Sequence, residues 1–194
     1  MYSFISKLAR LSAIVGGVVV TALIILTTLS VLGRGLNTLG HSDLLVGLSP
    51  ELAEALIATG VAPINGDFEL VEAGIAFAIF CFLPICQLFS GHATVDIFTN
   101  SLSERFNAYL RTFWEIVLAA VIILIAWRLF FGMTSAMRTG ETTFLLQFPI
   151  WWAYALSFAA SVVAAIVALY CAGARVAELV TGRAIMTRPM EIDH

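Results

Sequence analysis

The sequence predicts an all-α integral membrane protein with four transmembrane helices and additional interfacial amphipathic helices. Of the 194 residues, 60% are hydrophobic and only 12% are charged, and the mean hydropathy is +0.98. Soluble domains carry about 25% charged residues. In addition, four stretches of the chain are long and apolar enough to cross a bilayer, which takes about 20 residues. The chain therefore has too little polar surface to cover a water-soluble globule.

The four predicted spans cover residues 11–33, 73–91, 113–133 and 149–173, within a single membrane domain of residues 1–194. The first, second and fourth stretches contain no charged residue, whereas the third carries Glu115 near one end and Arg128 toward the other. We interpret the first stretch as a retained span, because its apolar run is too long for a signal peptide and no small-residue cleavage site follows before Arg34.

The basic residues predict the orientation of the spans. Three basic residues fall toward one side of the membrane, namely Arg34, Arg128 and Arg138. Seven fall toward the other side, in the two tails and in the connection between the second and third spans, namely Lys7, Arg10, Arg105, Arg111, Arg175, Arg183 and Arg188. Because cytoplasmic loops carry the excess of Lys and Arg, both termini are expected in the cytoplasm.

The outer connection, residues 34–72, is long and contains a predicted short helix. Ser49 is a suitable N-cap, Pro50 suits the first helical position, and Gly60 is a suitable terminator. We expect this helix to lie on the outer membrane surface or against a partner. Between positions 43 and 72 the chain has acidic but no basic residues, namely Asp43, Glu51, Glu54, Asp67, Glu69 and Glu72. This is either an outer loop without positive charge or a docking rim for a soluble partner.

The inner connection contains a predicted amphipathic segment, residues 94–112. Its apolar residues share one helical face, and they are Val95, Phe98, Leu102, Phe106 and Tyr109, followed by Phe113. Ser101 and Glu104 have the spacing of a capping box, so a helix is expected to begin there. We expect this helix to lie in the cytoplasmic interface and to lead into the third span. In the second span, Pro84 predicts a kink, because it removes a backbone donor.

Charged residues at the ends of the spans are candidates for pairing, because an ionisable group in a bilayer is costly. Arg34 ends the first span on the same side as Glu69 and Glu72, and we expect it to pair with one of them, preferably Glu72. Arg128 is expected either to snorkel outward or to pair with an acidic residue such as Glu141 or one of another subunit. Glu115 is one helical turn from Arg111 and is expected to reach it.

Aromatic residues mark the start of the fourth span. Pro149 suits the first turn of a helix, where its missing N–H costs nothing. Trp151, Trp152 and Tyr154 follow it, and amphipathic rings of this kind settle at the membrane–water boundary. These residues are expected to anchor the outer end of the helix, with Trp127 in the same belt.

The sequence offers no pattern typical of an enzyme, a metal site or a cofactor site. Membrane cytochromes bind haem through paired histidines within their spans, whereas the histidines here lie outside the spans, at His41, His92 and His194. The cysteines form no CxxC pair and are expected to be buried small residues, and they are Cys81, Cys86 and Cys171. No basic cluster indicates nucleic-acid binding. We therefore expect no catalytic residues and no cofactor.

Four motifs occur in a fixed order at the ends of the spans: VLGRG, GDFELVE, GHATVDIF and GETTFLLQFPIWWAY. With the four spans and the cytoplasmic termini, they make nearly the whole chain resemble the small membrane subunit of tripartite ATP-independent periplasmic (TRAP) transporters. The connection 34–72 is longer than the short turn of that family. The candidate interface or structural residues are Arg34, Glu69, Glu72, His92, Asp96, Arg128, Trp151 and Trp152.

The resemblance implies a non-catalytic subunit in the bacterial inner membrane. In such systems a large membrane subunit carries the substrate and Na⁺ sites and moves as an elevator, and a soluble periplasmic binding protein delivers a small, carboxylate-bearing solute. The small subunit enlarges the fixed scaffold of the large one and contacts membrane lipids. Two other hypotheses remain at this point: a stand-alone four-helix membrane redox protein, and an independent small carrier.

Overall fold

The computed structural model describes residues 2–89, 91 and 103–182. Its helices, in chain order, are α1 (Tyr2–Gly40), α2 (Asp43–Leu48), α3 (Pro50–Ala58), α4 (Asp67–Leu88), α5 (Glu104–Thr139) and α6 (Trp151–Thr181). The helices α1, α4, α5 and α6 are long and apolar enough to cross a membrane. The predicted all-α fold with four membrane-spanning helices is thus confirmed.

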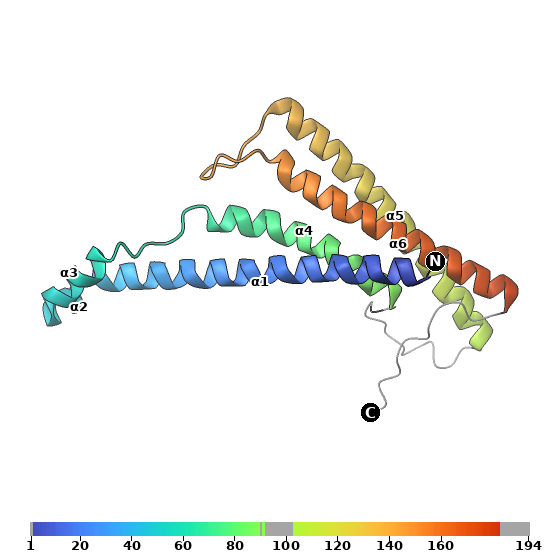
Figure 1. Cartoon of the computed structure of the whole chain (residues 1–194), viewed down its shortest axis with the longest axis horizontal. Helices are drawn as coiled ribbons and strands as arrows, with labels where there is room; N and C mark the ends of the chain where they lie inside the picture. Colours follow the sequence, from blue (N-terminus) through green and yellow to red (C-terminus); the bar gives the residue numbers. More distant parts are fainter. Residues whose placement is uncertain (1, 90, 92–102, 183–194) are drawn as a thin grey trace.

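The four long helices form two antiparallel pairs. Figure 1 shows α1 beside α4 and α5 beside α6, with the two pairs diverging from a common end. The N-terminus, the end of α4, the start of α5 and the end of α6 lie at that common end, which we call the proximal end. The opposite, distal end carries α2, α3 and the loop 140–150. The long helices therefore alternate in direction, as four consecutive membrane crossings require.

Helix α1 is much longer than its neighbour α4. Its 39 residues span about 58 Å, whereas the 22 residues of α4 span about 33 Å at ~1.5 Å per residue. Leu88, the last residue of α4, packs with Ile5 and Ala9 of α1 in one buried cluster. The end of α4 therefore lies beside the first turns of α1, and the last part of α1 extends beyond the start of α4 at the distal end (Figure 1).

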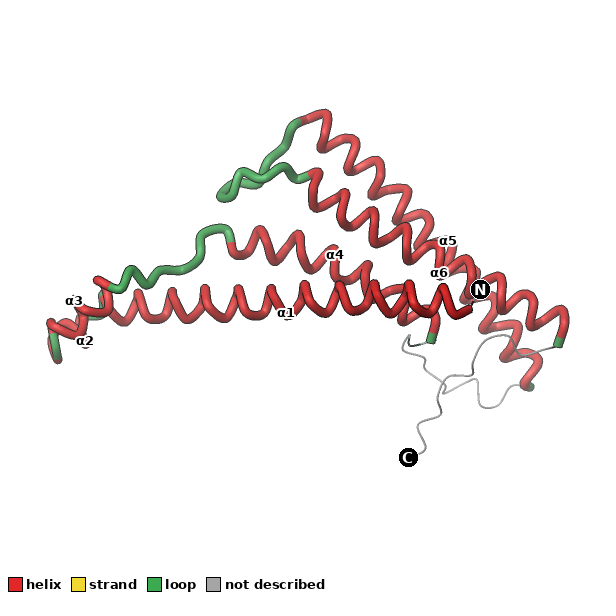
Figure 2. Tube along the Cα trace, viewed as in Figure 1, coloured by secondary structure: helices red, strands yellow, loops and turns green. Residues whose placement is uncertain are grey.

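The segment between α3 and α4 runs back along this extension of α1 (Figure 2). The backbone N–H of Ile64 donates to Ser30 Oγ at 3.2 Å. Gly33, one helical turn further along α1, lies against the carbonyl oxygen of Ala62, which would be only 2.4 Å from a β-carbon at this position. The serine hydroxyl and the missing glycine side chain let the returning backbone lie directly on α1.

Helix α6 is the centre of the bundle, since it contacts α5, α4 and α1. Its buried face consists mostly of small residues three or four positions apart, namely Ser157, Ala160, Ser161, Ala164, Ala168, Cys171 and Ala174, with Val167 among them. Small residues let membrane helices approach closely, and close contact rather than hydrophobicity drives helix association in lipid. The same device appears between α1 and α4, where a β-carbon on Gly16 would lie 2.8 Å from Cys81 Cβ.

The predicted helix boundaries need two corrections. The first span is part of a helix that extends well beyond residues 11–33 in both directions. Residues 104–112 belong to the same continuous helix as the third span, because Ser103 forms the N-cap by accepting a hydrogen bond from the backbone N–H of Phe106. Residues 94–102 of the predicted interfacial segment lie outside the described residues, and so does Ser101 of the predicted capping box.

The short outer helix agrees with its prediction. Ser49 occupies the N-cap position of α3 and Pro50 the first helical position. The helix ends at Ala58, with Thr59 as C-cap, and Gly60 then adopts the positive φ of +70° that favours glycine. In α4, Pro84 lies inside a helix that continues beyond it to Leu88.

Candidate docking surface and the Glu69 clamp

Most of the apolar surface of the spans is not buried within the chain. In the most hydropathic 18-residue window of each helix, only 11% of the residues of α1 and 17% of those of α5 are buried, against 44% for α6. Large exposed side chains cover α1 along its length, for example Val18 at 65% exposure. On α5 they include Trp127 at 60%. These faces require a cover of lipid or of another membrane protein, since water does not accommodate them.

The distal ends of the two helix pairs are joined by the buried carboxylate of Glu69. One carboxylate oxygen of Glu69 accepts a hydrogen bond from the backbone N–H of Leu145 at 2.7 Å, and the other accepts one from Leu146 at 3.0 Å. We call this arrangement the Glu69 clamp. The side chain is only 8% exposed. Hydrogen bonds to an ionised acceptor are roughly twice as strong as neutral ones, so the clamp fixes the α5–α6 loop on the start of α4.

The clamped loop, residues 140–150, has a defined conformation of its own. A β-bridge joins Thr142 and Pro149. The N–H of Thr143 donates to the carbonyl of Phe148 at 3.0 Å, and Gln147 adopts a φ of +55° at the turn. These contacts present two successive backbone N–H groups to one carboxylate.

A tight apolar contact lies beside the clamp. Gly66, the N-cap of α4, has a φ of +77°. A β-carbon at Gly66 would lie 2.4 Å from Leu146 Cγ, so the leucine side chain occupies the space that a larger residue would fill. The start of α4 and the loop 140–150 are therefore held together by both a charge and an apolar contact. No local sequence pattern predicts this pairing, because the partners are 76 and 77 residues apart and both hydrogen-bond donors are backbone N–H groups.

The predicted pairing of Arg34 with Glu72 is wrong for this chain by itself. Both side chains are exposed, and within the described part of the chain neither takes part in an ion pair within 4.0 Å. Glu69, the other predicted partner, is occupied by the loop. The loop 140–150 buries Glu69 and uses both of its carboxylate oxygens, so Glu69 is not available as an ion-pair partner for Arg34. The local sequence does not encode this distant contact.

The proximal end carries a second polar contact between helices. Gln87 of α4 is 1% exposed and donates its side-chain amide hydrogen to Glu115 of α5. Arg111 donates to the backbone carbonyl of Asn107. Among the residues that the structure describes, no ion pair joins Arg111 to Glu115, so that prediction is wrong. Helix geometry places Arg111 and Glu115 one turn apart, but the carboxylate accepts a hydrogen bond from the Gln87 amide across the α4–α5 interface.

The double tryptophan begins α6, as predicted, but Pro149 precedes the helix rather than starting it. Ile150 is the N-cap, and Pro149 accepts a hydrogen bond from the N–H of Trp152 through its carbonyl at 3.1 Å. The two indole rings contact edge to face, with centroids 6.1 Å apart. Trp151 is half-buried, whereas Trp152 is 52% exposed. The pair thus presents one ring to the bundle and one to the surroundings.

Arg128 lies on the exposed face of α5. Within the described part of the chain it forms no ion pair within 4.0 Å, either with Glu141 or with any other acidic residue. The remaining candidates, His92 and Asp96, lie outside the described residues.

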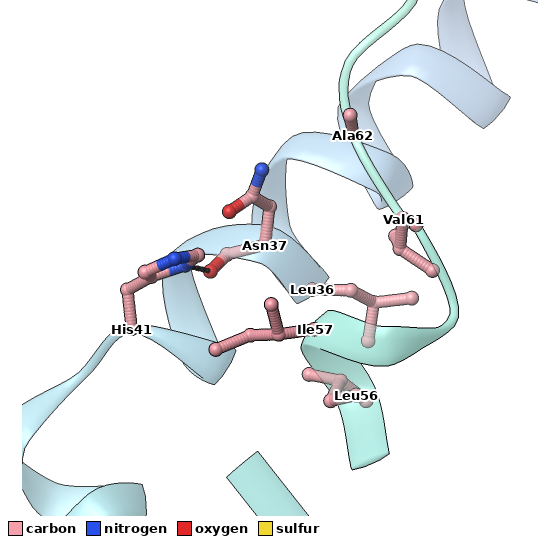
Figure 3. Close-up of a pocket in the computed structure, with 8 residues that line it drawn as sticks. Leu36, Asn37, His41, Leu56, Ile57, Val61 and Ala62 are labelled. Carbon is pink, nitrogen blue, oxygen red and sulfur yellow. Dashed lines mark hydrogen bonds between the residues drawn. The ribbon is translucent and has the colours of Figure 1, made fainter. Parts of the chain in front are cut away.

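A small pocket lies at the distal end, between the end of α1 and α3 (Figure 3). Its volume is about 210 Å³. Its lining is mainly apolar, from Leu36, Leu56, Ile57 and Val61. His41 Nδ1 lies 2.9 Å from the backbone carbonyl oxygen of Asn37, so one ring nitrogen is already engaged. Within the described residues, no three or more His, Cys, Asp or Glu side chains lie together in a group that could hold a metal ion.

A family model connects this architecture to transport. The model for the DctQ component of tripartite ATP-independent periplasmic transporters matches residues 57–181. The chain belongs to the DctQ component family. The match begins at the end of α3 and covers α4, α5 and α6, together with the loop 140–150 and Glu69. No curated protein and no solved structure matches the chain.

Membership in the DctQ component family confirms the predicted resemblance and makes the chain a membrane subunit of a transporter family. All of α1 and α2 and most of α3 lie outside the matched residues. The distal pocket therefore lies at the edge of the matched region, because Leu36, Asn37, His41 and Leu56 precede it whereas Ile57, Gly60, Val61 and Ala62 lie within it.

Proposed function

We propose that this chain is the non-catalytic small membrane subunit of a TRAP-type secondary transporter. It enlarges the fixed scaffold of a large elevator subunit. That subunit takes up a small, carboxylate-bearing solute, and a Na⁺ gradient drives the uptake. A periplasmic binding protein delivers the solute. The observation that carries this proposal is the family match over residues 57–181, and the exposed apolar faces of α1 and α5 are consistent with a large membrane partner.

The physical features of the bundle suit a stationary part. An elevator transporter needs one body that keeps its tilt and depth while another slides past it. The Glu69 clamp ties the two helix pairs together at their distal ends, where they otherwise diverge. Trp151 and Trp152 stand at the distal start of α6, where indole rings favour the membrane–water boundary. Both devices resist a change of shape or depth.

We place the distal end in the periplasm and the proximal end, with both termini, in the cytoplasm of a bacterial inner membrane. The basic residues support this orientation, since Lys7, Arg10, Arg105, Arg111 and Arg175 lie toward the proximal end. In this orientation Arg34, Glu72 and the Glu69 clamp lie at the periplasmic side.

Co-purification and transport by purified components test the proposal. An affinity-tagged chain is expressed together with a large multi-span TRAP permease from the same organism and extracted in mild detergent, and we expect the permease in the eluate. Proteoliposomes that contain both membrane chains and the binding protein are expected to accumulate solute when a Na⁺ gradient is applied. Vesicles with this chain alone serve as the control, and uptake by them would refute the scaffold role in favour of an independent carrier.

A further inference from the structure

Arg128 of α5 is an exposed charge on the apolar, membrane-crossing part of the helix. Two contacts between α5 and α6 set its level. Phe130 and Phe158 have ring centroids 5.6 Å apart, and Gly132 lies against the ring of Tyr154, which would be 2.6 Å from a β-carbon at that glycine. Gly132 and Tyr154 are therefore level. Trp152 lies two residues from Tyr154 toward the distal end, and Arg128 lies four residues from Gly132 toward the proximal end. At ~1.5 Å per residue, the arginine is about 9 Å deeper in the membrane than the tryptophans.

The surroundings of Arg128 on this face are apolar. Leu124 and Phe131, four residues before it and three after it, share its helical face and are both 52% exposed. Val121, seven residues before it, is 45% exposed. Next to it, the Trp127 ring contacts the Phe131 ring edge to face at 5.8 Å. We call Val121, Leu124, Arg128 and Phe131 the α5 face.

The direction of α5 opposes an escape of this charge to the nearer boundary. Side chains on a helix lean toward its N-terminus. Because α5 runs from the proximal to the distal end, the Arg128 side chain starts out directed toward the membrane interior. Snorkelling to the distal boundary therefore works against the helix geometry, whereas an arginine near the N-terminal boundary of a helix that runs in the opposite direction would reach that boundary readily.

We propose that the α5 face docks against a transmembrane helix of the large subunit, and that Arg128 pairs there with an Asp or Glu side chain of that helix. Charge complementarity selects this occupant. An arginine at this depth facing lipid tails is costly, but its planar guanidinium suits bidentate pairing with a carboxylate. The acidic groups at the distal end of this chain form no ion pair with it in the described residues. Arginine is also one of the residue types that are enriched in the core of protein–protein interfaces, together with aromatic residues.

This inference rests on the proposed function, because it names the surface and the chemistry by which the large subunit is held. The first experiment compares Arg128→Gln with Arg138→Gln in the co-purification assay. Arg138 is an exposed arginine in the last turn of the same helix and is a matched control. We expect Arg128→Gln to weaken retention of the large subunit roughly thirtyfold or more, as removal of one member of a desolvated pair does, and Arg138→Gln to retain it.

A second experiment locates the partner without changing the arginine. A photo-activatable benzoylphenylalanine is placed at Leu124 or Phe131 in the complex with the native Arg128. Cross-links to the large subunit are expected, and the cross-linked helix should carry the carboxylate. Replacement of that Asp or Glu of the large subunit by Arg is expected to restore binding to an Arg128→Glu variant of this chain, because the two charges of the pair are then exchanged.

The outcomes separate the inference from the proposed function. If the native chain retains the large subunit while Arg128→Gln retains it equally well, the docking face lies elsewhere and only this inference fails. Cross-links to lipid alone, with the complex intact, would assign Arg128 to a lipid phosphate and would equally overturn the inference. If the native chain does not retain the large subunit at all, the proposed function and the inference fail together.

Discussion

Replacing Glu69 with glutamine isolates the charge of the clamp at nearly constant side-chain size. The carboxylate is 8% exposed, and its two oxygens accept from the N–H groups of Leu145 and Leu146 at 2.7 and 3.0 Å. A glutamine keeps one oxygen acceptor, but its NH₂ group meets the second N–H as another donor. One hydrogen bond is therefore lost and the other loses its charge assistance.

The magnitude follows from these two bonds. A hydrogen bond to a charged group contributes about 1.5–3 kcal/mol, and a neutral one about 0.5–1.5 kcal/mol. The substitution is therefore expected to lower the free energy of opening the loop by roughly 2–4 kcal/mol. Since about 1.4 kcal/mol corresponds to a factor of ten, the exchange rates of the two amides should rise by at least tenfold if they exchange through local opening.

Amide hydrogen exchange of the chain in detergent micelles measures this directly. Exchange at Leu145 and Leu146 is compared between the native chain, Glu69→Gln and Glu72→Gln. Glu72 is an exposed acid one helical turn further along α4, so its variant controls for the loss of one negative charge at this end. Unchanged protection of the two amides in Glu69→Gln, or an equal loss in both variants, would refute the clamp.

Two further substitutions test the close approaches at glycine. Gly16→Ala is expected to lower the free energy of unfolding by about 1–3 kcal/mol, because a β-carbon there would lie 2.8 Å from the β-carbon of the facing α4 cysteine. Gly17→Ala, which would meet no atom within 4 Å, should leave it unchanged or slightly raised, and equal effects in an SDS-induced unfolding titration would contradict the assigned packing. Gly66→Ala is expected to destabilise the chain more than Gly60→Ala, because both positions have a positive φ but only Gly66 also lies against Leu146; the difference in thermal unfolding midpoint measures that contact, and identical shifts would argue against it.

The sequence by itself determined the four spans, because the hydropathy of about 20 consecutive residues is a local property and decides whether that stretch can cross the hydrocarbon core of a bilayer. It also determined the start of α3, where Ser49 and Pro50 specify a helix N-terminus through their own backbone chemistry. The order of the motifs, together with the four spans, was enough to indicate the family that the family model confirms.

The tertiary structure decided which faces of the helices are buried and which charges meet. In a soluble helix an apolar stripe marks the buried face, but in a membrane helix all faces are apolar, so the stripe does not distinguish lipid contact from helix contact. The small residues of α6 make that distinction only once their neighbours are in place. Likewise, Arg34 and Glu72 had a suitable position and charge in the sequence. The partner of Glu69 was a pair of backbone N–H groups more than 70 residues away, and backbone groups carry no residue-specific signal by which a sequence could reveal them.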